Sequence, residues 1–208
     1  MLETIIFDWS GVISNDITPV YHSCMKVLEV YGVETFNQEE FKKRSKNPHE
    51  LFWKDHIKSP DIVEIRALFR KFMEKEEKPK ILPGAKDTLE YLYANGKKLF
   101  VLSSHPQHFV EREAYNYKIK HLFVDLLGEK YDKAKGLYEM MHRYNLKKNS
   151  TLFVEDMTQG LIAGKENGLK TAGVLSGYHN EEHFRSLPER YQPDYIFKDI
   201  TELKSLFG

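Results

Sequence analysis

The sequence predicts an α/β fold in which a doubly wound parallel sheet carries a small all-helical insert after its first strand. Three observations lead to this prediction. Short apolar runs typical of buried strands alternate with segments of helical periodicity over most of the 208 residues. One long stretch near the N-terminus interrupts this alternation and has helical spacing only. Polar residues suited to chemistry follow several of the apolar runs, which is where ligands bind in such sheets.

The expected strands are continuous apolar runs, as is typical of strands buried on both faces of a parallel sheet. The first run covers residues 4–7 and ends at Asp8 and Gly11, and the later runs cover 98–102, 122–124, 151–154, 171–174 and 195–197. Segments with helical spacing lie near 84–95, 106–117, 133–145, 158–167 and 200–207. Strands that alternate with helices in this way predict parallel pairing.

The stretch from about residue 17 to residue 77 is expected to form a separate helical cap. Two long helices carry apolar faces, with shorter helical pieces around 38–45 and 49–57. The faces comprise Val20, Cys24, Val27, Leu28 and Tyr31 in the first helix and Ile62, Ile65, Leu68, Phe69 and Phe72 in the last. The charged run 74–80 is either a solvated helix end and linker or one of two hinge strands, with residues 14–16 as the other. We therefore expect a core domain of residues 1–16 and 78–208 and a cap of residues 17–77.

The composition and net charge limit the kinds of molecule that the protein is expected to bind. Lys plus Arg equals Asp plus Glu at 31 each, which gives no argument for nucleic acid or a membrane surface as a partner. The single cysteine, Cys24, fits a reducing compartment and a place in the cap core. No apolar run is long enough for a signal peptide or a membrane span. We expect a cytoplasmic protein that acts on a small molecule, with its oligomeric state left open.

Asp8 is the first candidate for chemistry, because it ends the first predicted strand. A carboxylate there can attack a phosphoryl group and form an aspartyl-phosphate. Gly11 allows the tight turn that presents neighbouring backbone amides. The alternative is that Asp8 only stabilises the turn.

Ser103, Ser104 and Lys133 are candidates for holding phosphate. The two serines follow the second central strand, where hydroxyls and free backbone N–H groups suit phosphate oxygens, or where they simply begin a helix before Pro106. Lys133 opens the helix after the third strand and can neutralise both a nucleophile and a transferring group. Lys135 is a neighbouring rival for that role.

Glu155 and Asp156 follow the strand at 151–154. Two adjacent acids at the edge of a core need a partner, since unpaired buried carboxylates are costly. Mg²⁺ is the natural partner because it prefers carboxylate oxygens, and a helix N-terminus is the alternative.

These sites occur in one order, each after a strand, and together they resemble the haloacid dehalogenase superfamily, subfamily I, with its helical cap. Its first motif, Asp-x-Asp-Gly-Thr/Val, is matched by residues 8–12 except at Ser10. The other motifs are matched by Ser103, by Lys133 and by the pair Glu155 and Asp156. The resemblance covers essentially the whole chain and implies a Rossmann-like core.

The resemblance also implies a mechanism. Asp8 attacks phosphorus, and Ser103, Ser104 and Lys133 hold the phosphoryl oxygens. Mg²⁺ is bound by a set of four residues: Asp8, the backbone carbonyl of Ser10, Asp156, and Glu155 in an assisting role. Trp9 and His105, which flank these motifs, are further candidates for contact with substrate, and for each the alternative is a purely structural place.

Ser10 departs from the family pattern. Phosphatases of the family have an Asp at this place as general acid and base, and a serine hydroxyl is a poor acid and a poor base near neutral pH. Three interpretations follow: a phosphatase that is slow or needs good leaving groups; an enzyme similar to phosphonoacetaldehyde hydrolase, with Lys54 of the cap as its Schiff-base lysine; or an impaired, phosphate-compound binding or regulatory protein. We expect the first, acting on a small phosphorylated metabolite.

Overall fold

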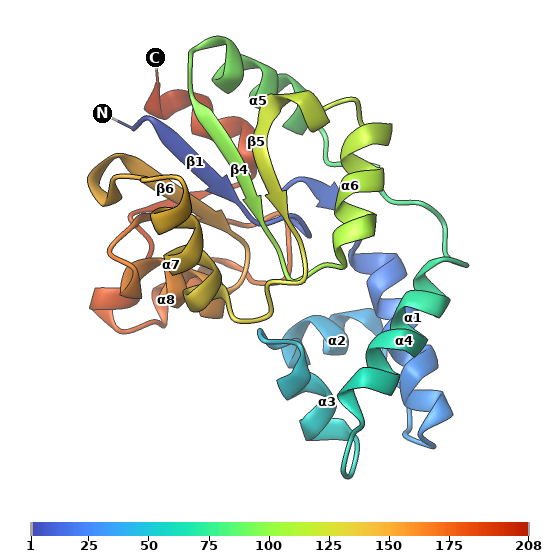
Figure 1. Cartoon of the computed structure of the whole chain (residues 1–208). Coiled ribbons are helices and arrows are strands. Elements are labelled where there is room, and N and C mark those ends of the chain that lie inside the picture. Colours follow the sequence, from blue (N-terminus) through green and yellow to red (C-terminus); the bar gives the residue numbers. More distant parts are fainter. Residues whose placement is uncertain (1, 208) are drawn as a thin grey trace.

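The computed structural model describes residues 2–207, which form an α/β core under a helical cap (Figure 1). Six parallel strands make the central sheet in the order β5-β4-β1-β6-β7-β8. Their bounds are Thr4–Phe7 (β1), Lys98–Leu102 (β4), Phe123–Leu127 (β5), Thr151–Glu155 (β6), Lys170–Val174 (β7) and Tyr195–Phe197 (β8). The predicted fold class, a Rossmann-like doubly wound sheet with a helical insert after the first strand, is confirmed.

The first strand of the chain lies in the middle of the sheet. All four residues of β1 are buried, and Phe7 pairs with Val101 of β4 on one side and with Val154 of β6 on the other. Because all three strands are parallel, their carboxyl ends meet at one edge of the sheet. The residues that follow β1, β4 and β6 therefore lie side by side, where the chain order reverses.

Helices cover both faces of the sheet, as the alternation of side chains along β1 requires. Ile5 and Phe7 belong to the hydrophobic cluster that includes α5 (Ala85–Ala94) and α6 (Gln107–Asn116). Ile6 points the other way, into the cluster that includes α7 (Lys133–Arg143) and α8 (Thr158–Glu166).

The periphery differs from the expected elements in three places. The C-terminal helix is a 3₁₀ helix, η4 (Ile200–Leu206), and the strand expected at 122–124 begins one residue later because η1 (Lys120–Leu122) precedes it. A five-residue helix, α9 (Glu181–Arg185), was not expected, because a helix so short has too few turns for periodicity. Two further 3₁₀ turns are η2 (Lys148–Ser150) and η3 (Glu189–Tyr191).

The cap consists of four helices with a hydrophobic core of their own. They are α1 (Ile17–Val30), α2 (Gln38–Arg44), α3 (Glu50–His56) and α4 (Ile62–Met73). The apolar faces predicted for α1 and α4 are buried or partly buried in this core, and Cys24 lies within it. Two short antiparallel strands, β2 (Ser14–Asn15) and β3 (Lys80–Ile81), form the connection to the core domain.

The cap is seated on the carboxyl edge of the sheet. Phe109 of α6 is fully buried in the cap cluster, and Phe41 of the cap packs edge-on against Tyr178, with ring centroids 6.0 Å apart. Arg112 of α6 donates to Glu74 at the end of α4 at 2.7 Å. Among residues 2–207, no helix is long and apolar enough to cross a bilayer.

Candidate active site

Asp8 lies at the centre of the carboxyl edge, next to Lys133. It directly follows β1, its exposed fraction is 6%, and its Oδ1 accepts from Lys133 Nζ at 2.6 Å. Lys133 is the first residue of α7, and it also donates to Leu102 O at 3.1 Å and to Glu155 Oε2 at 3.1 Å. Burial alone would lower the pKa of Lys133. The negative charges of Asp8 and Glu155 have a larger effect in the opposite direction, so the pKa of Lys133 is raised. The lysine is therefore held as a cation between two carboxylates.

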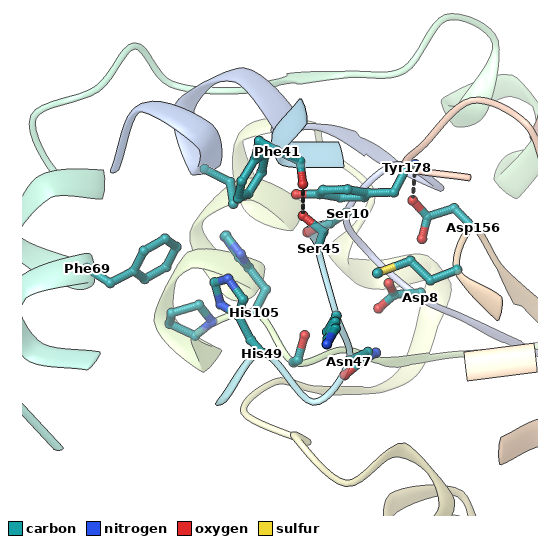
Figure 2. Close-up of a pocket in the computed structure, with 15 residues that line it drawn as sticks. Asp8, Ser10, Phe41, Ser45, Asn47, His49, Phe69, His105, Asp156 and Tyr178 are labelled. Atoms are coloured by element: carbon teal, nitrogen blue, oxygen red, sulfur yellow. Dashed lines mark hydrogen bonds between the residues drawn. The ribbon is translucent and has the colours of Figure 1, made fainter. Parts of the chain in front are cut away.

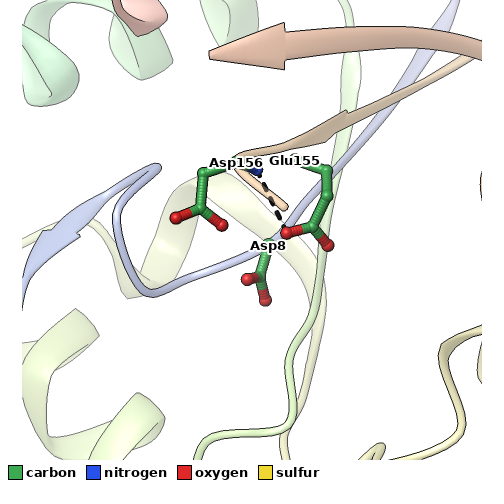
Figure 3. A group of neighbouring side chains, drawn as sticks. All are labelled: Asp8, Glu155 and Asp156. Carbon is green, nitrogen blue, oxygen red and sulfur yellow. Dashed lines mark hydrogen bonds between the residues drawn. The ribbon is translucent and has the colours of Figure 1, made fainter. Parts of the chain in front are cut away.

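Three buried carboxylates converge at this edge (Figure 3). One oxygen each from Asp8, Glu155 and Asp156 lies within 4.8 Å of the others. Burial raises the pKa of Glu155 and of Asp156, and the neighbouring acids raise both further. Lys133 is the one basic side chain in ion-pair range of these three acids in the described part of the chain, so three acids share one cation.

The two acids of the pair are held differently. Glu155 Oε1 accepts from the backbone N–H groups of Asp156 and Met157 at 3.1 and 3.2 Å. Asp156 Oδ2 accepts from Tyr178 N at 2.8 Å. Two glycines pack against Asp156: a Cβ at Gly177 would lie 1.8 Å from Asp156 Oδ2, and one at Gly11 would lie 2.4 Å from the same atom. This close backbone contact fixes the Asp156 carboxylate in place.

The donor set fits a divalent cation that prefers oxygen. Mg²⁺ prefers carboxylate oxygens and keeps part of its water shell when bound, and unpaired buried carboxylates are costly without a cation. The three acids provide such a set of oxygens without a thiol or imidazole ligand among them.

The serines expected to hold phosphate follow β4 at the same edge. Ser103 is buried, and its Oγ accepts from His105 N at 3.2 Å. Ser104 lines the pocket above Asp8. Neither serine caps α6 with its side chain, because Pro106 occupies the N-cap position. The simple helix-cap interpretation of these serines therefore has no support in the geometry.

Ser10 is hydrogen-bonded to Asp16, a residue outside the family's motifs. Its hydroxyl donates to Asp16 Oδ2 at 2.6 Å. Asp16 occupies the N-cap position of α1, yet its side chain accepts no bond from that helix and turns toward Ser10 instead. Burial raises the pKa of Asp16 to about 7, with Glu113 adding to the effect and His105 opposing it.

A pocket between cap and core opens onto these residues (Figure 2). Figure 2 shows Asp8 and Asp156 at one end and Phe69 of α4 at the other. The pocket has a volume of about 80 Å³. The cap contributes polar groups from the segment between α2 and α3, namely Ser45, Lys46, Asn47 and His49, and apolar groups from Val20, Phe41 and Phe69.

Three of the considered residues lie away from this pocket. Trp9 is fully buried, stacks on Tyr117 with ring centroids 6.1 Å apart and donates to Glu113 at 2.7 Å, and it does not line the pocket. Lys54 is exposed on α3 and does not line the pocket, which argues against its Schiff-base role. Lys135, the rival of Lys133, has a side chain 71% exposed and contacts Glu139 on its own helix.

Asp16, Glu113 and Tyr178 belong to the site but could not be identified from the sequence. The sequence offered one indication for Asp16, because it is an acid a few residues after the nucleophile candidate. The same position also suits a hinge residue, so the sequence could not distinguish the two roles. Glu113 lies in the middle of a helix. Its carboxylate accepts hydrogen bonds from Trp9 and Ser14, which are about one hundred residues away in the chain, and this contact is not visible in the sequence.

A parallel sheet with an acidic site at its carboxyl edge and a helical cap over that site is an architecture suited to an enzyme that binds a small ligand beyond the ends of its strands. The model of the haloacid dehalogenase-like hydrolases matches residues 5–174, and the chain belongs to that family.

Relatives of known name support this placement. A phosphoglycolate phosphatase of Haemophilus influenzae is 29% identical over 132 residues, which cover 61% of this chain and 57% of that protein. The pyrophosphatase PpaX of Anoxybacillus flavithermus is 24% identical over 215 residues, which cover 100% and 97%. A haloacid dehalogenase-like hydrolase of Streptococcus pneumoniae superposes with a TM-score of 0.86 at 17% identity, over 100% and 99% of the two chains, and shows the same fold.

Proposed function

We propose that the protein is a Mg²⁺-dependent phosphatase for a small phosphorylated metabolite, with Asp8 as nucleophile. The observation that carries the proposal is the position of Asp8 beside the Lys133 cation and the acids Glu155 and Asp156, at the end of a small pocket. A carboxylate held there can form an aspartyl-phosphate, since the cation stabilises the charge that develops during attack.

Each remaining residue has a part that follows from its contacts. Ser103 and Ser104 would bind the oxygens of the transferring phosphoryl group, and the positive charge of Lys133 would stabilise the charge on that group. Asp8, Asp156 and the backbone carbonyl of Ser10 would hold Mg²⁺. Glu155 assists, because both of its oxygens are already engaged by backbone N–H groups and Lys133. Bound there, Mg²⁺ supplies positive charge beside the phosphoryl oxygens.

The cap supports a small substrate. The pocket has a volume of about 80 Å³, and its wall combines polar groups of the segment Ser45–His49 with the rings of Phe41 and Phe69. The seated cap also excludes water from the reacting groups. The named relatives act on phosphoglycolate and pyrophosphate, which are both small phosphate compounds. We place the substrate of this chain in the same size class.

The test is hydrolysis of acetyl phosphate and p-nitrophenyl phosphate with and without Mg²⁺. Both substrates have leaving groups that need little protonation, so the departure at Ser10 does not limit them. We expect turnover that requires Mg²⁺ and that falls at least about 10⁴-fold in Asp8→Asn, as loss of a nucleophile does. Asp87→Asn, at an exposed position of α5, is the matched control.

Two outcomes would contradict the proposal. Turnover by Asp8→Asn at the wild-type rate would place the nucleophile elsewhere. Phosphate binding without turnover, and without a phosphorylated Asp8 on mass spectrometry, would indicate a binding or regulatory protein instead.

A further inference from the structure

The site has no obvious donor of a proton to the leaving group. Ser10 stands at the place of the family's acid, and its one hydroxyl hydrogen is engaged by Asp16 Oδ2 at 2.6 Å. Lys133 is committed to two carboxylates and a carbonyl beneath the pocket. A substrate with a poor leaving group therefore needs a proton from some other residue.

His105 is placed to be that group. It lies two residues after Ser103, its exposed fraction is 5%, and it lines the same pocket as Asp8 and Ser10. Its Nδ1 is 3.7 Å from Asp16 Oδ2, and its Nε2 is 3.6 Å from Glu113 Oε1. Both distances are in ion-pair range but longer than a hydrogen bond, so a ring N–H is not fixed to either carboxylate.

Unpartnered polar atoms are concentrated around this ring. Five buried side-chain polar atoms lack a hydrogen-bond partner in the described residues, and three of them are Asp16 Oδ1, His105 Nε2 and Glu113 Oε1. Folded proteins rarely leave such groups unpaired, and those they do leave often have a functional cause. Glu113 is held in place by Trp9 Nε1 at 2.7 Å and Ser14 Oγ at 2.8 Å, both on its other oxygen.

The charges around His105 favour its protonated form. Asp16 and Glu113 face it directly, Asp8 adds a weaker effect, and the cap residue His49 lines the same pocket. No lysine or arginine of the described chain pairs with Asp16 or Glu113. Burial lowers the pKa of His105, but the two carboxylates outweigh burial and the pKa lies above 6.5. Burial holds the pKa of His49 at about 4, so His49 stays neutral at pH 7.

We propose that His105, which lies between Asp16 and Glu113, is the general acid and base of this site and takes the part that Ser10 cannot fill. The inference rests on the proposed phosphatase function. As the bond from phosphorus to the leaving oxygen breaks and Asp8 bonds to phosphorus, a ring N–H proton passes to that oxygen. In the second step water attacks the phosphorus, its proton passes to neutral His105, and phosphate leaves Asp8.

The test compares p-nitrophenyl phosphate with phenyl phosphate, which are similar in size but differ in how much the leaving oxygen needs a proton. With Mg²⁺ present, we expect His105→Gln to lower kcat/KM for phenyl phosphate about 100-fold more than for p-nitrophenyl phosphate, within the usual range for acid catalysis. The loss of phenyl phosphate turnover at high pH, as His105 deprotonates, should disappear in the variant.

Two further variants separate chemistry from folding. His105→Gln/Glu113→Gln removes the carboxylate that would otherwise be left without its cation, and it should show the same selective loss with a recovered melting temperature. His108→Gln, on α6 near its start and with a side chain 52% exposed, should leave both rates and their ratio unchanged.

Three results would overturn the inference. One is a rate ratio that changes less than about threefold in His105→Gln. Another is a selective loss in Asp16→Asn that His105→Gln does not show, which would make Asp16 the acid. The third is a wild-type protein that turns over p-nitrophenyl phosphate but has no measurable activity on phenyl phosphate. A wild-type protein inactive on both substrates with Mg²⁺ would instead refute the phosphatase function on which the inference rests.

Discussion

Lys133 Nζ lies 2.6 Å from Asp8 Oδ1, and both side chains are almost fully buried. The pair joins the first residue of α7 to the residue that follows β1, so it links two segments 125 positions apart in the chain. In such a place a cation does two things at once. It offsets the cost of burying the nucleophile candidate and Glu155, and it presents positive charge where a phosphoryl group would bind.

We therefore predict that Lys133→Met destabilises the protein by about 3–5 kcal/mol, because it leaves two buried carboxylates without their cation. Urea unfolding in Mg²⁺-free buffer measures this change. Lys133→Met/Asp8→Asn should recover part of the loss, since one of the two orphaned charges is gone. Lys135→Met, an exposed position on the same helix, is the control and should change stability by less than about 0.5 kcal/mol. An equally small effect of Lys133→Met would mean that the acids are neutral without it.

Mg²⁺ should stabilise the folded protein, since it binds a site that the unfolded chain lacks. At a concentration one hundred times its Kd the gain is about 2.7 kcal/mol. A thermal unfolding series with increasing MgCl₂, at constant ionic strength, measures it. Asp156→Asn should abolish the gain, whereas Asp199→Asn, at the start of η4, should retain it. An Mg²⁺ response that survives in Asp156→Asn would place the ion elsewhere.

The strands and the order of the site residues could be predicted from the sequence because both are local patterns. The run Thr4–Phe7 is buried at every position and has three apolar residues in a row, as is typical of a central strand, and Asp8 follows it directly. The cluster of Asp16, His105 and Glu113 could not be predicted, because it depends on how the segments that precede α1 and α6 come together with α6 in the fold. Trp9 illustrates the same limit: a residue next to the nucleophile candidate in the chain points into the core.

The bond between Ser10 and Asp16 changes what Ser10→Asp should do. The substitution introduces a second carboxylate within hydrogen-bond reach of Asp16, and two acids so close cannot both ionise. We expect Ser10→Asp alone to gain little activity on phenyl phosphate. Ser10→Asp/Asp16→Ser keeps one acid and one hydroxyl but exchanges their places, and it should be roughly tenfold more active than Ser10→Asp. Equal activity of the two variants would show that Asp16 does not restrain residue 10.

Asp16 should also make the stability of the protein depend on pH. Its pKa is about 7 in the folded state against 3.8 as the ordinary value, so between these values the folded protein holds the proton that the unfolded chain has lost. The stability contribution of protonated Asp16 is complete below pH 3.8 and is lost as pH rises toward 7. The free energy of unfolding without Mg²⁺ should therefore fall over this range more steeply in wild type than in Asp16→Asn. Parallel curves for the two proteins would show that Asp16 is ionised throughout.

Gly177 should control metal binding without contacting the metal. A Cβ at this position would lie 1.8 Å from Asp156 Oδ2 and 2.5 Å from Asp156 Cβ, so the Asp156 carboxylate must move if residue 177 becomes alanine. The displaced carboxylate loses its bond from Tyr178 N and its alignment with Asp8. Because partners that orient a ligand are commonly worth 10–100-fold in metal affinity, we expect Gly177→Ala to weaken Mg²⁺ binding by about that factor in calorimetric titration. Gly32→Ala in the cap, where a Cβ meets no atom within 4 Å, should lose about 1 kcal/mol through its positive φ but keep full Mg²⁺ affinity. Unchanged affinity in Gly177→Ala would mean that Asp156 can bind Mg²⁺ from a shifted position, and its close packing against residue 177 would then have no part in the metal site.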